Sequence, residues 1–439
     1  MNSNVSLKKQ FLKFLVPSVT AMWIFSLYTM VDGIFVSRGV GETALAAVNI
    51  AMPFVNFIFA ISMLFSTGVS TIISIYLGKN NIKKANEIFS FNLFCMLIVS
   101  LIITLLCLIN IDSISLFLGA TETNFNLVKD YLKIIITFNG FFIVSYCLEV
   151  LTKADGYPHL AIIGMLISAL TNIVLDFLFV IILNLGIKGA AYATIISQGV
   201  SFIFFFSHFM SKKSKLTLTK FKLNIKYLKR ILSIGFPDAV TELTSGIVIL
   251  LFNQTILRHI GENGIVTYSI ICYVSTLVIM TMIAITQGIQ PLCSYYYGKE
   301  EFNIIKKLIK MSLKVVAISS IVIFSICILF ANEIVYIFIK DPSSFTYIYS
   351  VWAFRLFSSA FLVLGFNILI SGYFASIEEA FKATIISIAR GLIFISIALF
   401  FLSHYFGDTG IWIATLVSEL ICLLLSLSLL LRRNKVIKQ

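Results

Sequence analysis

Charged side chains are scarce in this sequence. Only 12% of its 439 residues are Asp, Glu, Lys or Arg, whereas soluble globular proteins carry about 25%. Hydrophobic residues make up 59%. A chain with so few charges cannot cover its surface with water-contacting side chains, which excludes a soluble globular protein and makes lipid the expected main solvent.

Histidine and paired cysteines are also lacking. The seven cysteines all lie inside apolar runs without a CxxC spacing, which argues against disulfide and metal roles. An intramembrane enzyme would need clustered histidines or acids at a membrane face. The four histidines are instead scattered, at His159, His208, His259 and His404. We therefore expect no cofactor and no enzymatic activity.

The basic residues do not form a folded basic face. The formal net charge is +13, but lysines and arginines fall in short clusters between apolar runs, so we expect no nucleic-acid partner. The first apolar run contains Pro17 and Asp32 and lacks a small-residue cleavage site, so no cleavable signal peptide is expected.

Crossing a bilayer takes about 20 apolar residues per helix. We predict an all-α integral membrane protein with twelve transmembrane helices. Their approximate ranges are 11–36, 43–77, 88–111, 128–151, 160–184, 189–210, 228–256, 265–296, 309–331, 345–371, 381–403 and 410–431.

Most of the 33 basic residues lie in one set of alternating loops. That set includes the densest cluster, between residues 212 and 230, together with both ends of the chain. Basic loops stay on the cytoplasmic side. We therefore expect a multi-pass protein of the plasma membrane with both termini in the cytoplasm.

The second half of the sequence repeats the first at a constant offset. Positions 14–79 align with 234–299 without gaps, and the identities fall on informative residues. Among the matches are Pro17 with Pro237, Gly41 with Gly261, Tyr76 with Tyr296 and Gly78 with Gly298; one insertion later, Gly186 matches Gly407.

The repeat predicts two six-helix lobes. We place the N-terminal lobe at 1–210, a basic cytoplasmic linker at 211–226 and the C-terminal lobe at 227–439. An even number of spans per half relates the lobes by a pseudo-two-fold axis along the membrane normal, which suits alternating access around a central cavity. A duplication retained only for folding is the alternative.

Four polar residues are expected to meet in the outer half of the N-terminal bundle. Ionisable groups inside spans cost roughly 2.5–3.5 kcal/mol each, so they indicate function. Counting residues along the spans places Asp32, Asn172, Asp176 and Thr194 at similar depth, and Asn172 precedes Asp176 by one helical turn.

This set offers only oxygen ligands, which hard cations prefer. Without a cation the two carboxylates would repel, so one should hold a proton. Either Na⁺ or H⁺ could be the coupling ion. In the second half of the repeat, Phe252 stands at the position of Asp32, Leu392 at that of Asn172 and Ser396 at that of Asp176. Only Thr194 has an equivalent of the same residue type. A structural network would be expected in both halves, so we favour cation coupling over helix bundling by hydrogen bonds.

Three further residues are candidates. Glu149 stands four residues before Lys153, which favours a local ion pair over recruitment of a cationic substrate. Glu242 occurs only in the second half and is a candidate substrate or proton contact. Pro17 interrupts the first span and could act as a hinge or as a static kink.

Three segments resemble the multidrug and toxic compound extrusion (MATE) family. They are MVDGIFVSRGVGETALAAVNIAMP at 30–53, YLGKNNIKKANEIF at 76–89 and KADGYPHLAI at 153–162. The resemblance implies two six-helix lobes that exchange Na⁺ or H⁺ for cationic, amphipathic drugs. The family's N-lobe cation site is an Asp on span 1, an Asn and an Asp on span 5 and a Thr on span 6, which correspond to Asp32, Asn172, Asp176 and Thr194.

The expected function is therefore a multidrug efflux antiporter that works as a monomer in the bilayer and exports small cationic amphipathic compounds. A flippase for lipid-linked precursors shares this general architecture and is the alternative. It would need a cationic central cavity, yet the spans contain few basic residues beyond Arg355 and Arg390.

Overall fold

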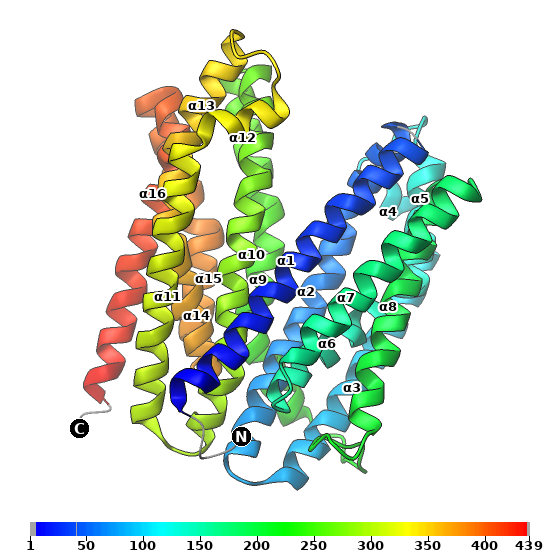
Figure 1. Cartoon of the computed structure of the whole chain (residues 1–439), viewed down its shortest axis with the longest axis vertical. Helices are drawn as coiled ribbons and strands as arrows, with labels where there is room; N and C mark the ends of the chain where they lie inside the picture. Colours follow the sequence, from blue (N-terminus) through cyan, green and yellow to red (C-terminus); the bar gives the residue numbers. More distant parts are fainter. Residues whose placement is uncertain (1–5, 41, 437–439) are drawn as a thin grey trace. The chain divides into compact units, whose positions relative to one another are not determined.

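The computed structural model describes residues 6–40 and 42–436, and every regular element among them is helical (Figure 1). Ten of the described helices are long and apolar enough to cross a membrane, and a bent pair adds an eleventh. The longest run, Ala380–Arg432, is broken at Gly407, whose φ of 55° and ψ of −133° are not helical. Dividing the run there gives the twelve predicted spans.

The chain forms two compact units. The first comprises Met1–Ala239 and Pro291–Glu301, and the second comprises Val240–Gln290 and Phe302–Gln439. Both helices that pass from one unit to the other do so beside a proline, at Pro237 and at Pro291. The predicted lobe boundary near 211–226 stays a prediction.

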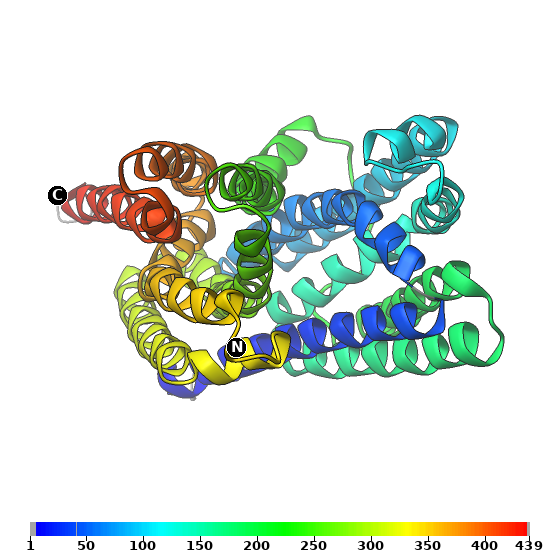
Figure 2. The same cartoon turned by 90° about the horizontal axis from the view of Figure 1, so that it is seen from above.

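The first unit is a bundle of long helices with two short ones (Figures 1 and 2). Its own elements are α1 (Leu7–Gly39), α2 (Glu42–Gly78), α3 (Ile82–Ile109), α4 (Ile111–Phe117), α5 (Phe125–Thr137), α6 (Asn139–Ala154), α7 (His159–Asp176), the π-helix η1 (Phe177–Ile182) and α8 (Gly186–Met210). Helices α5 and α6 form the bent span, with an angle of 52° between them.

The second unit holds most of α9 (Ile225–His259) and α10 (Glu262–Gly298) and all later elements. These are α11 (Phe302–Leu329), α12 (Ala331–Phe338), α13 (Phe345–Ser358), the 3-10 helix η2 (Ser359–Leu362), α14 (Leu364–Ser376), α15 (Ala380–Ile388), the π-helix η3 (Ala389–Ile393) and α16 (Phe394–Val436).

The distribution of exposed apolar side chains on the helices shows which faces contact lipid. On α3, Leu97, Leu101 and Leu105 follow one another at four-residue spacing and are 54–62% exposed, whereas Ile88 and Met96 are fully buried. An apolar stripe exposed on a helix of this length is the surface expected against hydrocarbon.

The repeat reappears in the turns. At the end of α2, Asn80 has a left-handed φ of 56°, and its repeat equivalent Glu300 has a φ of 64°. In both turns the amide of the next residue donates to the carbonyl five positions before it, from Asn81 to Tyr76 and from Glu301 to Tyr296. Gly186 and Gly407, the glycines matched across the insertion, both have positive φ. Gly41, matched to Gly261 in the sequence, lies outside the described residues.

Helix α2 and the last turns of α10 cross at two glycines within the first unit. A Cβ on Gly78 would lie 2.1 Å from the Tyr295 carbonyl oxygen, and one on Gly298 would lie 2.1 Å from that of Ile75. Tyr295 and Ile75 are themselves equivalent positions of the repeat, so the two contacts are images of each other. Only glycine allows the two backbones to approach this closely.

The basic linker packs against the first unit. Asn86 on α3 bonds both the amide and the hydroxyl of Thr217, and Asp155 accepts the amide of Lys215 at 2.9 Å. The prediction of a basic cytoplasmic linker did not include this close attachment to α3.

Candidate functional site

Asp32 and Asp176 come together inside the first unit. Asp32 lies on α1, and Asp176 is the last residue of α7, where the backbone passes into η1. Their carboxyl groups are within hydrogen-bonding reach of each other. A π-helical segment often marks a functional position, because the extra residue per turn redirects the neighbouring side chains.

The polar atoms of this site have no protein partners. One oxygen of Asp32, both oxygens of Asp176 and both side-chain polar atoms of Asn172 are buried without a hydrogen bond. Asn172 and Asp176 are 1% and 0% exposed. Buried polar groups are almost always hydrogen-bonded, and an orphaned one costs roughly 1–3 kcal/mol. A proton shared by the carboxyl groups, or a cation between them, would satisfy these atoms.

Thr194 lies on α8, half-buried, and α8 packs along α7. Among the described residues, no hydrogen bond joins its hydroxyl to the carboxylate pair. Its part in cation binding therefore stays a prediction.

Two tyrosines belong to the site, and neither was among the predicted site residues. Tyr28, one turn before Asp32, and Tyr131 on α5 are both buried and lie within electrostatic reach of both carboxylates. Tyr131 was missed, although a polar ring in the amphipathic segment Phe125–Thr137 was a usable signal.

The equivalent position in the second unit is filled differently. Phe252, which aligns with Asp32, is 1% exposed and stacks on Tyr268 with ring centroids 5.0 Å apart. Phe357 packs edge-on against the ring of Phe252, with ring centroids 6.2 Å apart. A close-packed aromatic cluster thus occupies the place of the carboxylate.

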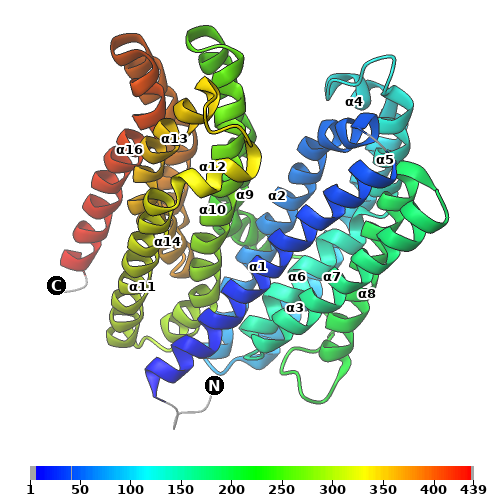
Figure 3. The ribbon, with the colours of Figure 1, turned by 45° about the horizontal axis from the view of Figure 1, so that its top comes forward.

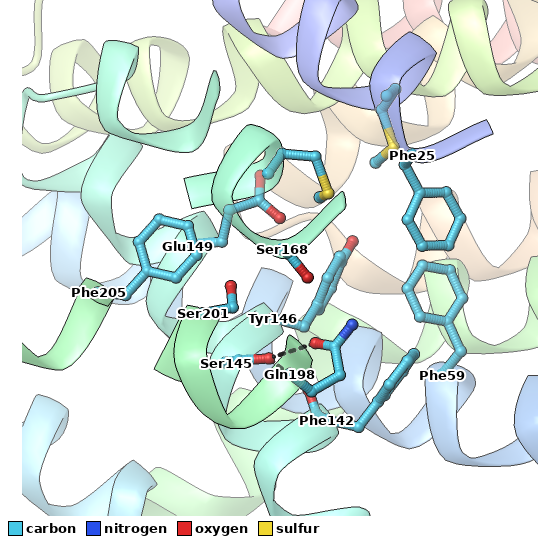
Figure 4. Close-up of a pocket in the computed structure, with 12 residues that line it drawn as sticks. Phe25, Phe59, Phe142, Ser145, Tyr146, Glu149, Ser168, Gln198, Ser201 and Phe205 are labelled. Atoms are coloured by element: carbon cyan, nitrogen blue, oxygen red, sulfur yellow. Dashed lines mark hydrogen bonds between the residues drawn. The ribbon is translucent and has the colours of Figure 1, made fainter. Parts of the chain in front are cut away.

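A narrow cavity lies within the first unit (Figure 4). Its lining comprises Met22, Phe25, Phe59, Phe142, Ser145, Tyr146, Glu149, Met165, Ser168, Gln198, Ser201 and Phe205. The cavity volume is about 30 Å³, which is room for one or two water molecules. Admitting a drug-sized molecule would require the aromatic side chains to move.

Gln198 connects the cavity with Tyr28. Its amide oxygen accepts a hydrogen bond from Ser145 at 2.9 Å, as Figure 4 shows. The same side chain is within hydrogen-bonding reach of the Tyr28 hydroxyl. Gln198 thus joins the cavity wall to Tyr28, whose hydroxyl lies within electrostatic reach of Asp32.

Glu149 forms the expected local ion pair. Its Oε1 lies 3.0 Å from Lys153 Nζ, and the two side chains are 4% and 2% exposed. Lys153 therefore already neutralises the one acid among the lining residues.

Glu242 and Pro17 are the remaining candidates. Glu242 lies on α9 in the second unit, half-buried and without an ion pair in the described part of the chain. Pro17 lies within α1, which continues through it, and Ser18 donates to the Phe14 carbonyl at 3.0 Å. The static structure fits both a fixed kink and a hinge.

Glu419, which aligns with Gln198, accepts hydrogen bonds at both carboxylate oxygens in the second unit. Arg390 Nε donates to one of its oxygens at 2.7 Å, and Asn367 donates to the other at 2.7 Å. Ser426 in turn donates to Asn367 at 2.9 Å. This closed network ties α14, η3 and α16 together.

The fold and the site define a polytopic membrane transporter. The sequence model of the family described as MatE matches residues 17–178 and 237–402, and the chain therefore belongs to the MATE family. Members of this family are transporters and not enzymes.

Proteins of known name and structure agree with this assignment. The chain is 28% identical to the multidrug export protein MepA of Staphylococcus haemolyticus, over 96% of this chain and 93% of that protein. It is 27% identical to MepA of Staphylococcus aureus, over 95% and 92%. An outward-facing multidrug resistance MATE transporter of the MOP superfamily has the same fold, with a TM-score of 0.93, 24% identity and coverage of 99% and 98%.

Proposed function

We propose that this protein is a secondary active antiporter that exports cationic amphipathic compounds in exchange for Na⁺ or H⁺. The observation that carries the proposal is the pair Asp32 and Asp176, buried together with unsatisfied oxygens. The names of the staphylococcal relatives support multidrug export as the direction and breadth of transport.

The ligand set suits a monovalent hard cation or a proton. In the described part of the chain, no three His, Cys, Asp or Glu side chains gather into a metal site. The proposed set is instead two carboxylates with the Asn172 amide oxygen and the Thr194 hydroxyl. Carboxylate, amide and hydroxyl oxygens are the ligands that hard cations prefer.

Exchange follows from electrostatics within this set. Two carboxylates at hydrogen-bonding distance in a low-dielectric bundle cannot both stay charged, so a proton or a cation must lie between them. Loss of that ion forces a rearrangement of α1 against α7. Tyr28 and Gln198 pass the rearrangement to the cavity wall. Pro17 offers a place where α1 can bend.

The cavity chemistry supports cationic, aromatic substrates. Its walls carry the rings of Phe25, Phe59 and Tyr146, whose faces attract cations. No lysine or arginine is among its lining residues, which is unfavourable for the pyrophosphate headgroup of a lipid-linked precursor. We therefore prefer drug export to the flippase alternative.

We also propose the orientation and organisation that the sequence indicates. The protein is a multi-pass, monomeric component of the plasma membrane with cytoplasmic termini. Its lobes are residues 1–210 and 227–439, joined by the linker 211–226. The bias of basic residues toward one set of loops supports this topology.

Dye efflux from cells tests the proposal. Cells that express the protein should lose ethidium faster than control cells, and Asp32→Asn should abolish that gain while the variant still inserts into the membrane. Ser396→Ala is the matched control, because Ser396 holds the position of Asp176 in the other repeat. Undiminished efflux by Asp32→Asn would remove Asp32 from the mechanism.

A further inference from the structure

A second cavity lies on the second unit, at the turn between α11 and α13. Its volume is about 550 Å³, which is within the range of small-molecule sites. Its lining comprises Ile328, Asn332, Tyr347, Ile348, Val351, Trp352, Arg355 and Leu356. Nothing in the proposed transport mechanism uses this cavity.

Arg355 is the single basic residue of the lining and is without a partner. It is exposed and forms no ion pair and no hydrogen bond in the part of the chain that the structure describes. The opposite face of α13, with Ser350 and Phe354, is buried in the unit. Arg355 is therefore presented outward with an uncompensated charge.

Arg355 lies toward the N-terminal end of the apolar run Phe345–Ser376, which at 32 residues is longer than a bilayer crossing requires. Helix α13 begins at Phe345, three turns before Arg355, so the arginine lies about 15 Å along the helix axis. Helical side chains lean toward the N-terminus of their helix. We therefore expect the guanidinium to reach back toward the membrane surface at the α12 end, as a snorkelling arginine does.

The surroundings of the cavity are typical of a membrane interface. Trp352 is 40% exposed in the cavity wall, and Tyr336 and Phe338 of α12 are 45% and 44% exposed. Figures 2 and 3 show α12 running across the direction of α11 and α13. Tryptophan and tyrosine gather at the headgroup level of a bilayer, and an amphipathic helix across the bundle lies in the same plane.

The cavity thus combines one exposed cation with an apolar wall. Tyr347 donates its hydroxyl to the Asn332 carbonyl at 3.1 Å, which joins α13 to α12 at the polar end of the cavity. Ile328, Ile348 and Leu356 supply apolar surface for hydrocarbon. A free inorganic anion would use only the guanidinium, whereas an anionic phospholipid would use both the charge and the apolar wall.

We propose that this cavity binds an anionic phospholipid, with the phosphate on Arg355 and an acyl chain along the apolar wall. The lipid belongs to the leaflet at the α12 end of the unit, which is the outer leaflet in the proposed orientation. The site is independent of the ion and substrate sites of the first unit.

Trp352 provides a built-in reporter. The chain has three tryptophans; Trp412 is buried, and Trp23, which is 53% exposed, is replaced by Phe in the test protein. The purified full-length protein is reconstituted with dibrominated phosphatidylglycerol or dibrominated phosphatidylcholine. Quenching of Trp352 then measures the relative binding constant of the two lipids at the cavity, and Trp352→Phe in the same protein gives the background from Trp412.

Phosphatidylglycerol should bind about fivefold more strongly than phosphatidylcholine, because one basic residue near the surface contributes roughly 1 kcal/mol with anionic lipid. Arg355→Gln should reduce the ratio of the two binding constants to about one, and Arg355→Lys should keep part of the preference for phosphatidylglycerol. Lys133→Gln, an exposed lysine on α5 without an ion pair in the described residues, should leave the ratio unchanged.

Two results would overturn the proposal. One is a lipid preference that survives Arg355→Gln in a protein whose thermal transition is unchanged. The other is loss of the preference on adding about 10 mM inorganic phosphate at constant ionic strength, since a site for free anions would be competed and a lipid site would not. If Arg355→Gln fails to fold, Arg355→Lys and the phosphate competition still decide the question.

Discussion

At the scale of single residues, the buried acids of this protein differ in whether they have a hydrogen-bond or ion-pair partner. Glu149 and Lys153 neutralise each other inside the first unit, and Glu419 is held by Arg390 and Asn367 inside the second. Asp32 and Asp176 have no such partner. Their environment differs from that of both other acids, which is why we propose that they hold the exchangeable ion.

The Glu149 ion pair yields a stability prediction. Glu149→Ala leaves the Lys153 ammonium buried without a counterion, which should cost about 3–5 kcal/mol. The double variant with Lys153→Met removes both charges and should recover most of that loss. The measurement is the thermal unfolding of the purified protein, followed by tryptophan fluorescence. Equal loss in the single and double variants would show that packing, and not charge, holds this position.

Most of the candidate ion site could be predicted from the sequence, because depth along a membrane helix follows from counting residues. Asp32 and Asp176 were paired in this way, although their helices are far apart in the chain. Counting could not place Tyr131, because α5 and α6 bend by 52° near Phe138 without a proline to signal the break; only its polar ring in an amphipathic segment marked it. The orphaned state of Asn172 could not be predicted either, since it depends on which neighbours stay out of reach.

At the scale of elements, apolar periodicity predicted the spans but not the shorter pieces. The predicted first and second spans, 11–36 and 43–77, lie within α1 and α2. The short helices α4 and α12 went unpredicted, because seven or eight residues at a membrane surface give no transmembrane signal. The π-helices η1 and η3 were also invisible, since one extra residue per turn changes the hydrophobic pattern too little.

The glycine crossing of α2 and α10 gives a prediction at this scale. Gly298→Ala places a methyl group 2.1 Å from the Ile75 carbonyl oxygen, so the helices must separate, at a cost of about 1–3 kcal/mol. The thermal transition of the purified protein should fall accordingly. Gly199→Ala is the control, because a Cβ there meets nothing within 4 Å and should gain helix propensity. A Gly298→Ala protein as stable as the control would contradict the tight crossing.

At the scale of the whole molecule, the repeat explains both what the halves share and where they differ. The turns after α2 and α10 keep the same hydrogen bonds at equivalent positions, which shows that the halves share a scaffold. In the second half, Phe252, which stacks on Tyr268, takes the place of Asp32, and Ser396 takes the place of Asp176. Because the halves share their backbone geometry but only the first carries the carboxylates, the repeat favours ion coupling in the N-terminal lobe alone.

The measurement that tests ion coupling most directly is dye efflux from proteoliposomes under separately imposed Na⁺ and H⁺ gradients. An inward gradient of at least one of these ions should drive efflux in the wild-type protein, and the same gradient should drive none in Asp32→Asn. Ser396→Ala should respond as the wild type does. Efflux that ignores both gradients, or that follows a gradient equally well without the Asp32 carboxylate, would contradict the account.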